Sequence, residues 1–368
     1  MKILYLARFL PDEGSTTHMY TLAEGFIDRG HEVHMISGGP TDHQGAIGIF
    51  NEISQYGLHH HKVRFPLNTM YGFWGQVSQM LLYTFVIPKV IFMMWKIKPD
   101  VIHVHYPVTS YLAKIYGKIT GRKFLTTHHI SGIPKHPLHK KADAVIAISR
   151  ELETELLNHF QYSPGQINLI FNGVSREKFN KSIEEWNKKE LGIPGENVII
   201  GYVGSYSHRK GLDILMDAFA NVEGKAHLVL LGDGDTEWVN KLIESHGLID
   251  KVTLYPFQAP VKFYAAFDVL VLPSRKEGFP LVPLEAMMMG VPTVRSNVEG
   301  AKDQIEHQVD GYIFENENAE DLSVYLNLLV NDADLRVAIG RKARVKALEK
   351  FTEATMLDEL LKVYEEIS

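Results

Sequence analysis

The sequence of 368 residues contains no cysteine, which excludes disulfides, thiolate catalysis and cysteine-ligated zinc or iron-sulfur sites. This composition fits a reducing compartment, and we expect a cytoplasmic protein. Three motifs are also missing: a Gly-x-Gly-x-x-Gly after the first strand, a P-loop and a Gly-x-Ser-x-Gly turn. Their absence argues against a dinucleotide oxidoreductase, a P-loop NTPase and an α/β-hydrolase.

Long apolar runs are missing as well. The most apolar stretch, Met80 to Lys96, is interrupted by Pro88 and Lys89 into pieces too short to span a bilayer. We expect a buried helix of a first domain there, with a lipid-contacting surface as the alternative.

The net charge of −6 divides into +5 for residues 1–178 and −11 for the remainder. The basic half could bind an anionic membrane surface or an acidic acceptor, or its charges could simply be solvated. We expect no nucleic-acid partner.

Apolar strands alternate with helical patterns twice along the chain, which is typical of parallel sheets covered by helices. Strands are expected at residues 3–7, 32–37, 101–105, 124–127, 144–148, 168–171, 198–203, 227–231, 252–255, 269–272 and 292–295. A polar stretch, residues 175–194, separates the two series. The sequence therefore predicts an α/β fold with two Rossmann-like domains, 1–178 and 179–350, whose parallel sheets face a central cleft. A C-terminal helix, 351–368, could pack back on the first domain.

Two glutamates, Glu277 and Glu285, lie eight residues apart between an apolar strand ending at Leu272 and a helical pattern beginning at Leu281. The loop therefore lies at the carboxyl end of a parallel strand, where doubly wound proteins bind ligands. The first N-H groups of the following helix suit a phosphate, whereas carboxylates suit hydroxyl groups. Together they suggest a nucleotide-sugar as ligand. Either glutamate could instead serve only the fold, for example as a helix cap.

A second strand-turn-helix unit opens the second domain. Gly204 and Ser205 follow its strand, and Arg209 and Lys210 precede the next helix. Glycine permits close approach to a ligand and the two cations would hold a diphosphate, although such pairs on loops are often only solvated.

Histidine is abundant, with 18 residues, so few can be functional. His59 to His61 resemble an exposed loop. His103 and His105 point to one side of a strand, with His105 at its carboxyl edge. His128 and His129 end the next strand, and we expect one of them to face the cleft too, with His128 in a substrate role. A hydrogen-bonded core histidine is the alternative for each.

The stretch from Glu277 to Met287 resembles the Glu-x7-Glu region of glycosyltransferase family 4. Supporting segments are residues 29–33, 100–105, 142–149, 172–174, 209–211, 290–294 and 310–314, so the resemblance covers both domains. It implies a GT-B fold and a retaining, metal-independent transfer of a sugar from a UDP- or GDP-sugar to a hydroxyl acceptor, with no cofactor. The acceptor is unknown, and a lipid-linked one in glycan or glycolipid synthesis is one option.

The resemblance also implies roles for individual residues. Glu277 would contact the donor sugar, Glu285 the ribose, and Lys210 with Arg209 the diphosphate. The backbone of the Gly278, Phe279, Pro280 and Leu281 segment would bind the sugar or its phosphates, beside Gly204 and Ser205. His128 would lie near the reacting sugar, and Gly14, Ser15 and His105 on the acceptor side. The chain departs from the family where Ser205 replaces a frequent arginine and where Gly14-Ser15 replaces a Gly-Gly pair.

Two other functions fit the same residues. A nucleotide-sugar epimerase of the same fold would convert its donor without an acceptor. A non-catalytic protein of this fold would bind a nucleotide or a partner only, although the paired glutamates and Lys210 argue against that.

Overall fold

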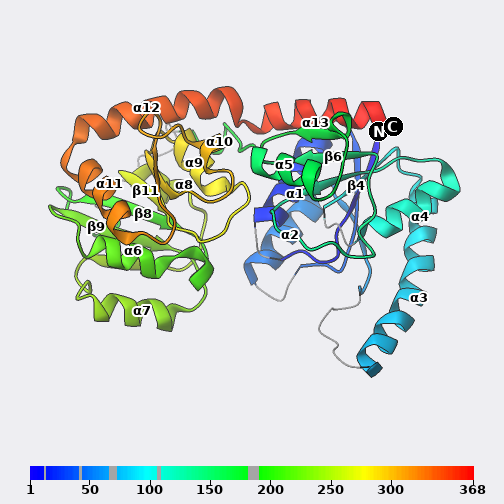
Figure 1. Cartoon of the computed structure of the whole chain (residues 1–368), viewed down its shortest axis with the longest axis horizontal. Coiled ribbons are helices and arrows are strands. Elements are labelled where there is room, and N and C mark those ends of the chain that lie inside the picture. Colours follow the sequence, from blue (N-terminus) through cyan, green and yellow to red (C-terminus); the bar gives the residue numbers. More distant parts are fainter. Residues whose placement is uncertain (12–13, 41–43, 66–72, 106–108, 181–189) are drawn as a thin grey trace. The chain divides into compact units, whose positions relative to one another are not determined.

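A computed structural model of the chain describes residues 1–11, 14–40, 44–65, 73–105, 109–180 and 190–368. Its contacts divide the chain into two compact units, Met1–Ile170 with Met356–Ser368, and Phe171–Thr355. Each unit has its own parallel sheet with helices around it (Figure 1). The predicted α/β class with two parallel sheets is confirmed.

Seven parallel strands form the sheet of the first unit, in the order β3-β2-β1-β4-β5-β6-β7. They are β1 (Lys2–Leu6), β2 (Glu32–Ser37), β3 (His59–Lys62), β4 (Val101–Val104), β5 (Leu125–His128), β6 (Ala144–Ala147) and β7 (Ile167–Leu169). Strand order reverses between β1 and β4, which pair directly. The loops that follow these two strands therefore leave the sheet at a topological switch point, the usual ligand-binding position in such sheets.

The helices of this unit are α1 (Gly14–Asp28), α2 (Gln44–Tyr56), α3 (Phe73–Ile97), α4 (Ser110–Thr120), α5 (Arg150–Asn158) and most of α13 (Glu353–Ile367). Helix α13 buries apolar side chains three or four positions apart, so one face of it joins this unit. Tyr364 is fully buried there, with its ring 5.1 Å from that of Phe26. Figure 1 shows α13 beside the N-terminus.

Six parallel strands form the sheet of the second unit, in the order β10-β9-β8-β11-β12-β13. They are β8 (Val198–Val203), β9 (Ala226–Leu231), β10 (Val252–Tyr255), β11 (Val269–Leu272), β12 (Thr293–Ser296) and β13 (Tyr312–Phe314). The helices are α6 (Leu212–Phe219), α7 (Thr236–Ser245), α8 (Val261–Ala266), α9 (Leu281–Met288), α10 (Ala301–Gln304), α11 (Ala319–Asn331) and α12 (Ala333–Lys350). Strand β13 has only three residues and was not predicted.

The histidine run was wrongly predicted as a loop. His59 to His61 form most of β3, which pairs with β2 at the edge of the first sheet. The Nδ1 atom of His34 lies 3.0 Å from Nε2 of His61, and Oγ of Ser37 lies 2.8 Å from Nε2 of His60. Cross-strand polar contacts of this kind stabilise an edge strand that lacks the usual apolar alternation.

Helix α3 also differs from its prediction. It runs unbroken past Pro88, which we expected to divide it. Pro88 is exposed, so the carbonyl group that loses its helical donor can bond to water. The helix is not buried all round either: Val86, Val90 and Met94 are buried, whereas Phe85, Phe92 and Trp95 are 74%, 53% and 60% exposed. In the described part of the chain, no helix combines the length and apolarity needed to cross a bilayer.

Candidate donor site

The second sheet reverses its strand order between β8 and β11, which pair through Ile200 and Val269. The loops after these strands contain Lys210 and Glu277, the residues singled out in the sequence. The turn at 208–210 packs directly against the end of β11, because a side chain at Gly211 would come within 2.0 Å of the Pro273 carbonyl oxygen. Gly211 also has a φ of 70°, which favours glycine. The two loops are thereby held together at the switch point.

Lys210 and Glu277 form an ion pair in which Nζ donates to Oε1 over 2.6 Å. The lysine side chain is 15% exposed and the glutamate side chain 8%. Burial is the largest single effect and raises the pKa of Glu277, but the Lys210 ammonium group, Ser274 and Arg209 together outweigh it, so the net shift is downward. Glu277 is therefore a carboxylate that can accept hydrogen bonds from hydroxyl groups at neutral pH.

Arg275 joins the same two loops, and sequence reasoning missed it. Its Nη1 and Nη2 atoms donate to the two carboxylate oxygens of Asp213 over 2.8 and 2.7 Å, and its Nε donates to Glu317 over 2.8 Å. The backbone N-H of Arg275 donates to the Arg209 carbonyl over 2.9 Å. Such a bidentate pair fixes geometry as well as charge, so Arg275 positions the cationic turn. Its partners are distant in sequence, and no local pattern indicates them.

Arg209 itself is exposed. Its Nη1 donates to the Lys276 carbonyl over 3.3 Å, which directs the guanidinium toward the glutamate loop. Ser205 is also exposed, and Gly204 approaches the next strand so closely that a side chain at Gly232 would lie 1.9 Å from the Gly204 carbonyl oxygen. The structure thus brings Gly204, Ser205 and the cationic turn to the same edge of the sheet.

The backbone from Gly278 to Leu281 is held rigidly. Asn172 donates to the Phe279 carbonyl and Gln304 donates to the Pro280 carbonyl, both over 2.8 Å. Helix α9 begins at Leu281 with Pro280 as its N-cap, and proline brings no side-chain acceptor for the first N-H groups of the helix. Those N-H groups therefore suit an anionic ligand beside Glu277.

Glu285 lies on the first turns of α9 and is half-buried. Burial raises its pKa, and the hydrogen bond from the Tyr264 hydroxyl over 2.6 Å offsets only part of that rise. One carboxylate oxygen is thus used within the fold, and no group in the described part of the chain forms a hydrogen bond with the other. The structure brings Glu285 and Glu277 onto consecutive parts of one loop-helix segment, as their spacing indicated.

In the first unit the histidines fall on two faces of the sheet. His103 is fully buried between the Tyr364 hydroxyl and the Thr127 hydroxyl, each 2.7 Å away. Because successive side chains of a strand alternate, His128 projects from the face opposite to Thr127. The side chain that reaches His105 is His129, at 3.3 Å. Of the two histidines at the end of β5, His129 is therefore the one beside His105, and His128 lies on the other face of the sheet.

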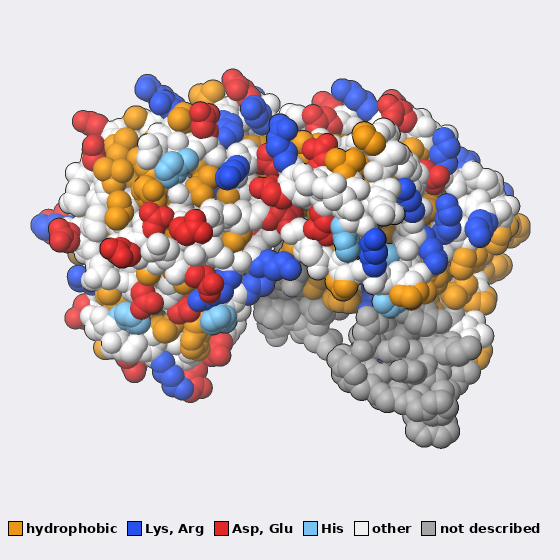
Figure 2. Space-filling model, in the orientation of Figure 1, with side chains coloured by type: hydrophobic (Ala, Val, Ile, Leu, Met, Phe, Trp, Pro, Cys, Tyr) orange, Lys and Arg blue, Asp and Glu red, His pale blue; other side chains and the backbone are white. Residues whose placement is uncertain are grey.

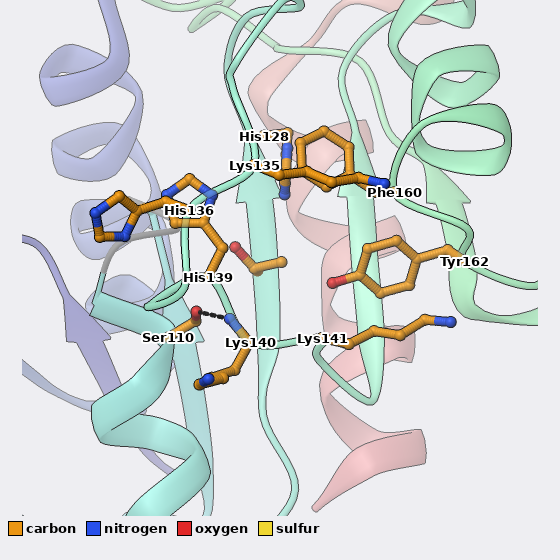
Figure 3. A pocket seen from close by; sticks show the side chains of 10 residues that line it. Ser110, His128, Lys135, His136, His139, Lys140, Lys141, Phe160 and Tyr162 are labelled. Atoms are coloured by element: carbon orange, nitrogen blue, oxygen red, sulfur yellow. Dashed lines mark hydrogen bonds between the residues drawn. The ribbon is translucent and has the colours of Figure 1, made fainter.

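His128 lines a pocket of about 220 Å³ (Figure 3). Thr126 from the same strand also belongs to its lining. Its ring packs edge-on against Phe160, with centroids 5.0 Å apart. Burial, and next the neighbouring His139, lower the pKa of His128 to about 4, so the ring is neutral at neutral pH. Gly14 and Ser15 begin α1 directly after residues 12–13, which lie outside the described residues.

Two family models match the chain in succession, and together they cover most of it. Residues 13–178 match the model described as Glycosyltransferase Family 4, and residues 183–346 match the model described as Glycosyl transferases group 1. The chain belongs to the family 4 glycosyltransferases. Their GT-B fold is confirmed by solved structures, among them HepE of Anabaena in complex with UDP-glucose, with a TM-score of 0.83, 21% identity and full coverage of both chains.

Two curated relatives of this family 4 chain carry activities in their names. The capsular polysaccharide biosynthesis glycosyltransferase CapM of Staphylococcus aureus is 30% identical over 61% of this chain and 61% of its own length. The N-acetyl-alpha-D-glucosaminyl L-malate synthase of Bacillus anthracis is 28% identical over 73% of this chain and 75% of its own length. The match with CapM thus spans less than two thirds of that relative.

Proposed function

We propose that the protein transfers a sugar from a nucleotide diphosphate sugar, UDP- or GDP-linked, to a hydroxyl acceptor in glycan or glycolipid synthesis. The ion pair of Lys210 and Glu277 at the switch point of the second sheet carries this proposal. One cation and one carboxylate, both largely buried, match the two halves of such a donor. The relative HepE, solved with UDP-glucose, supports UDP as the nucleotide.

In the proposed complex the side chains exchange partners. The diphosphate draws the Lys210 ammonium group away from Glu277, and donor hydroxyl groups replace it on the carboxylate. Arg209 and the first N-H groups of α9 add positive potential, and the free oxygen of Glu285 accepts from the ribose. Both members of the ion pair gain a new partner in the complex, so donor binding leaves no buried charge unpaired.

The same groups suit the chemical step. When the bond between the sugar and the diphosphate breaks, the sugar becomes oxocarbenium-like and negative charge grows on the leaving phosphate. Lys210 and Arg209 stabilise that charge, so we propose a metal-independent reaction with no cofactor. The acceptor hydroxyl attacks from the side the diphosphate leaves, and the configuration at the sugar is retained. Gly14, Ser15 and His105 of the first unit remain our proposed residues on the acceptor side, and His128 remains our proposed residue near the reacting sugar.

The purified protein tests this assignment when it is incubated with a panel of UDP- and GDP-sugars and candidate acceptors. We expect acceptor-dependent release of the nucleotide diphosphate with one donor, and a product with unchanged anomeric configuration. Conversion of the donor to an epimer without acceptor would establish the epimerase instead. Tight donor binding with no turnover on any acceptor would favour a non-catalytic role.

We also propose that the protein binds peripherally to the inner, anionic face of a membrane. Helices α3 and α4 expose Phe85, Phe92, Trp95 and Ile119. Between residues 53 and 142 the sequence has twelve lysines and arginines but only one acidic residue, Asp100. Figure 2 shows hydrophobic and basic side chains side by side over this part of the first unit. An apolar surface with basic neighbours is what anionic bilayers bind, and a lipid-linked acceptor would be found there.

A further inference from the structure

The pocket beside His128 belongs wholly to the first unit, and no residue of the Lys210-Glu277 site lines it. Strand β5 forms its floor, where Thr126 and His128 lie two positions apart and so project to the same side. One wall is Phe160 and Tyr162, after α5, and the other is the segment 135–141. The Ser110 hydroxyl accepts from the Lys140 backbone N-H over 2.6 Å and so ties that segment to the start of α4.

Three polar atoms in this pocket lack partners. Among the described residues, nothing forms a hydrogen bond with Oγ1 of Thr126, Nδ1 of His128 or Nδ1 of His139. Thr126 is 2% exposed and His128 is 3% exposed. A buried polar group without a partner costs about 1–3 kcal/mol, so groups of this kind commonly mark the place of a ligand or a bound water.

The charge around the pocket has one sign. Lys135, Lys140 and Lys141 belong to its lining, and no aspartate or glutamate does. The nearest carboxylates in sequence are already bonded elsewhere: Asp143 accepts from the Phe124 backbone N-H over 3.0 Å, and Glu155 accepts from that of Gly132 over 2.8 Å. Hydroxyl and imidazole groups at the floor with ammonium groups at the rim form a site for an oxyanion rather than for a cation.

We propose that this pocket binds an oxyanion, a phosphate or a carboxylate, carried by the acceptor substrate. Thr126 and the neutral rings of His128 and His139 bond the anion, and the lysines attract it and balance its charge. The apolar walls at Phe160 and Tyr162 cover the adjoining carbon atoms. This inference rests on the proposed function, because it makes the first unit the acceptor-binding half of a transferase. It narrows the acceptor from any hydroxyl compound to one that carries a phosphate or carboxylate group.

Calorimetric titration of the full chain tests the proposal, with glycerol 3-phosphate as the phosphate probe and L-malate as the carboxylate probe, at constant ionic strength in chloride. We expect millimolar or tighter binding of at least one probe. The variant Thr126→Val removes one hydroxyl at nearly constant volume, and Lys135→Gln with Lys140→Gln removes two rim charges. Each should weaken binding at least fivefold.

The control pair Lys118→Gln with Lys123→Gln removes the same charge from exposed positions of the same unit outside the pocket. It should leave probe affinity within twofold of the parent. Equal weakening by both lysine pairs, unchanged affinity in Thr126→Val, or no binding of either probe would overturn the inference. Titration of UDP and GDP into the same samples separates the two proposals. Normal binding of one of these nucleotides with no anion binding defeats only this inference, whereas a parent protein that binds neither UDP nor GDP defeats the proposed function.

Discussion

Lys210 and Glu277 are 67 residues apart in the chain, yet their side chains meet over 2.6 Å at the point where the second sheet reverses its strand order. Neither charge has much water around it, since the two side chains are 15% and 8% exposed. Each therefore depends on the other until a ligand replaces one of them. This dependence leads to the first prediction.

Lys210→Met should destabilise the second unit, because it leaves the Glu277 carboxylate buried without its cation. Breaking a buried pair on one side costs about 3 kcal/mol, whereas replacing both partners by apolar groups is often close to neutral. We therefore expect Lys210→Met with Glu277→Leu to be more stable than Lys210→Met alone. Urea unfolding of the three proteins measures this. A double variant no more stable than the single would show that the pair is not coupled.

Arg275→Lys should weaken donor binding although Arg275 itself is not proposed to touch the donor. Lysine cannot reproduce the two parallel bonds to Asp213, so the turn that carries Lys210 loses its anchor. The loss of a charged hydrogen bond predicts a donor dissociation constant about tenfold higher. Lys276→Ala, an exposed neighbour, is the control and should bind as the parent does. Equal affinities for Arg275→Lys and the control would refute the positioning role.

Membrane binding should depend on the apolar side chains of α3. We expect the protein to co-sediment with vesicles containing anionic lipid at low salt, and less so at 0.5 M salt, where electrostatic attraction is screened within roughly 4–5 Å. Phe85→Ser, Phe92→Ser and Trp95→Ser combined should abolish this. The matched control replaces Ile249, Phe257 and Val337, which are exposed apolar residues of the second unit, by serine as well, and it should sediment with the vesicles as the parent does. Full recovery of the parent protein in the supernatant would refute the membrane proposal.

The first unit should lose stability in mild acid. Burial is the main cause that lowers the pKa of His18 to about 3 and the pKa values of His103, His105 and His129 well below 6.5. The unfolded chain binds these protons near pH 6.5 and the folded chain does not. Stability is therefore fully present above pH 6.5 and declines as pH falls, by up to about 1.4 kcal/mol per pH unit for each histidine.

Unfolding free energies measured between pH 7.5 and 4.5 test this sign. We expect the unfolding free energy to fall toward pH 4.5 with a slope that corresponds to the uptake of several protons on unfolding. Stability that is flat or rises toward pH 4.5 would show that these rings are already protonated in the fold.

Local patterns in the sequence predict most of the fold. The strands at 198–203, 252–255 and 269–272 are present with the predicted bounds, because buried parallel strands are short apolar runs between turn residues. The edge strand of His59–Lys62 was missed, since its stability comes from polar contacts with β2 that no local pattern reveals. The course of α3 past Pro88 was missed because an exposed proline costs a helix less than a buried one.

In the candidate site, too, some residues are predicted from local sequence and others are found only from the tertiary fold. Lys210, Glu277 and Glu285 follow from their positions after strands, and the structure brings the first two into contact. Arg275 and the unpartnered hydroxyl of Thr126 could not be found this way. Their significance depends on Asp213 and on the segment 135–141, which only the tertiary fold places beside them. The face on which His128 projects likewise depends on strand register, which is set by the whole sheet.

In the proposed complex the Lys210-Glu277 pair receives a diphosphate on one side and a sugar on the other. The affinities of UDP and of the preferred UDP-sugar for the parent protein, for Glu277→Gln and for Lys210→Met test it most directly, without knowledge of the acceptor; a GDP-linked donor would be tested in the same way. Glu277→Gln should bind the sugar nucleotide about 10- to 100-fold more weakly while UDP affinity changes little. Lys210→Met should weaken both ligands. Parent-like affinity of Glu277→Gln for every nucleotide-sugar would show that Glu277 does not bind the donor sugar.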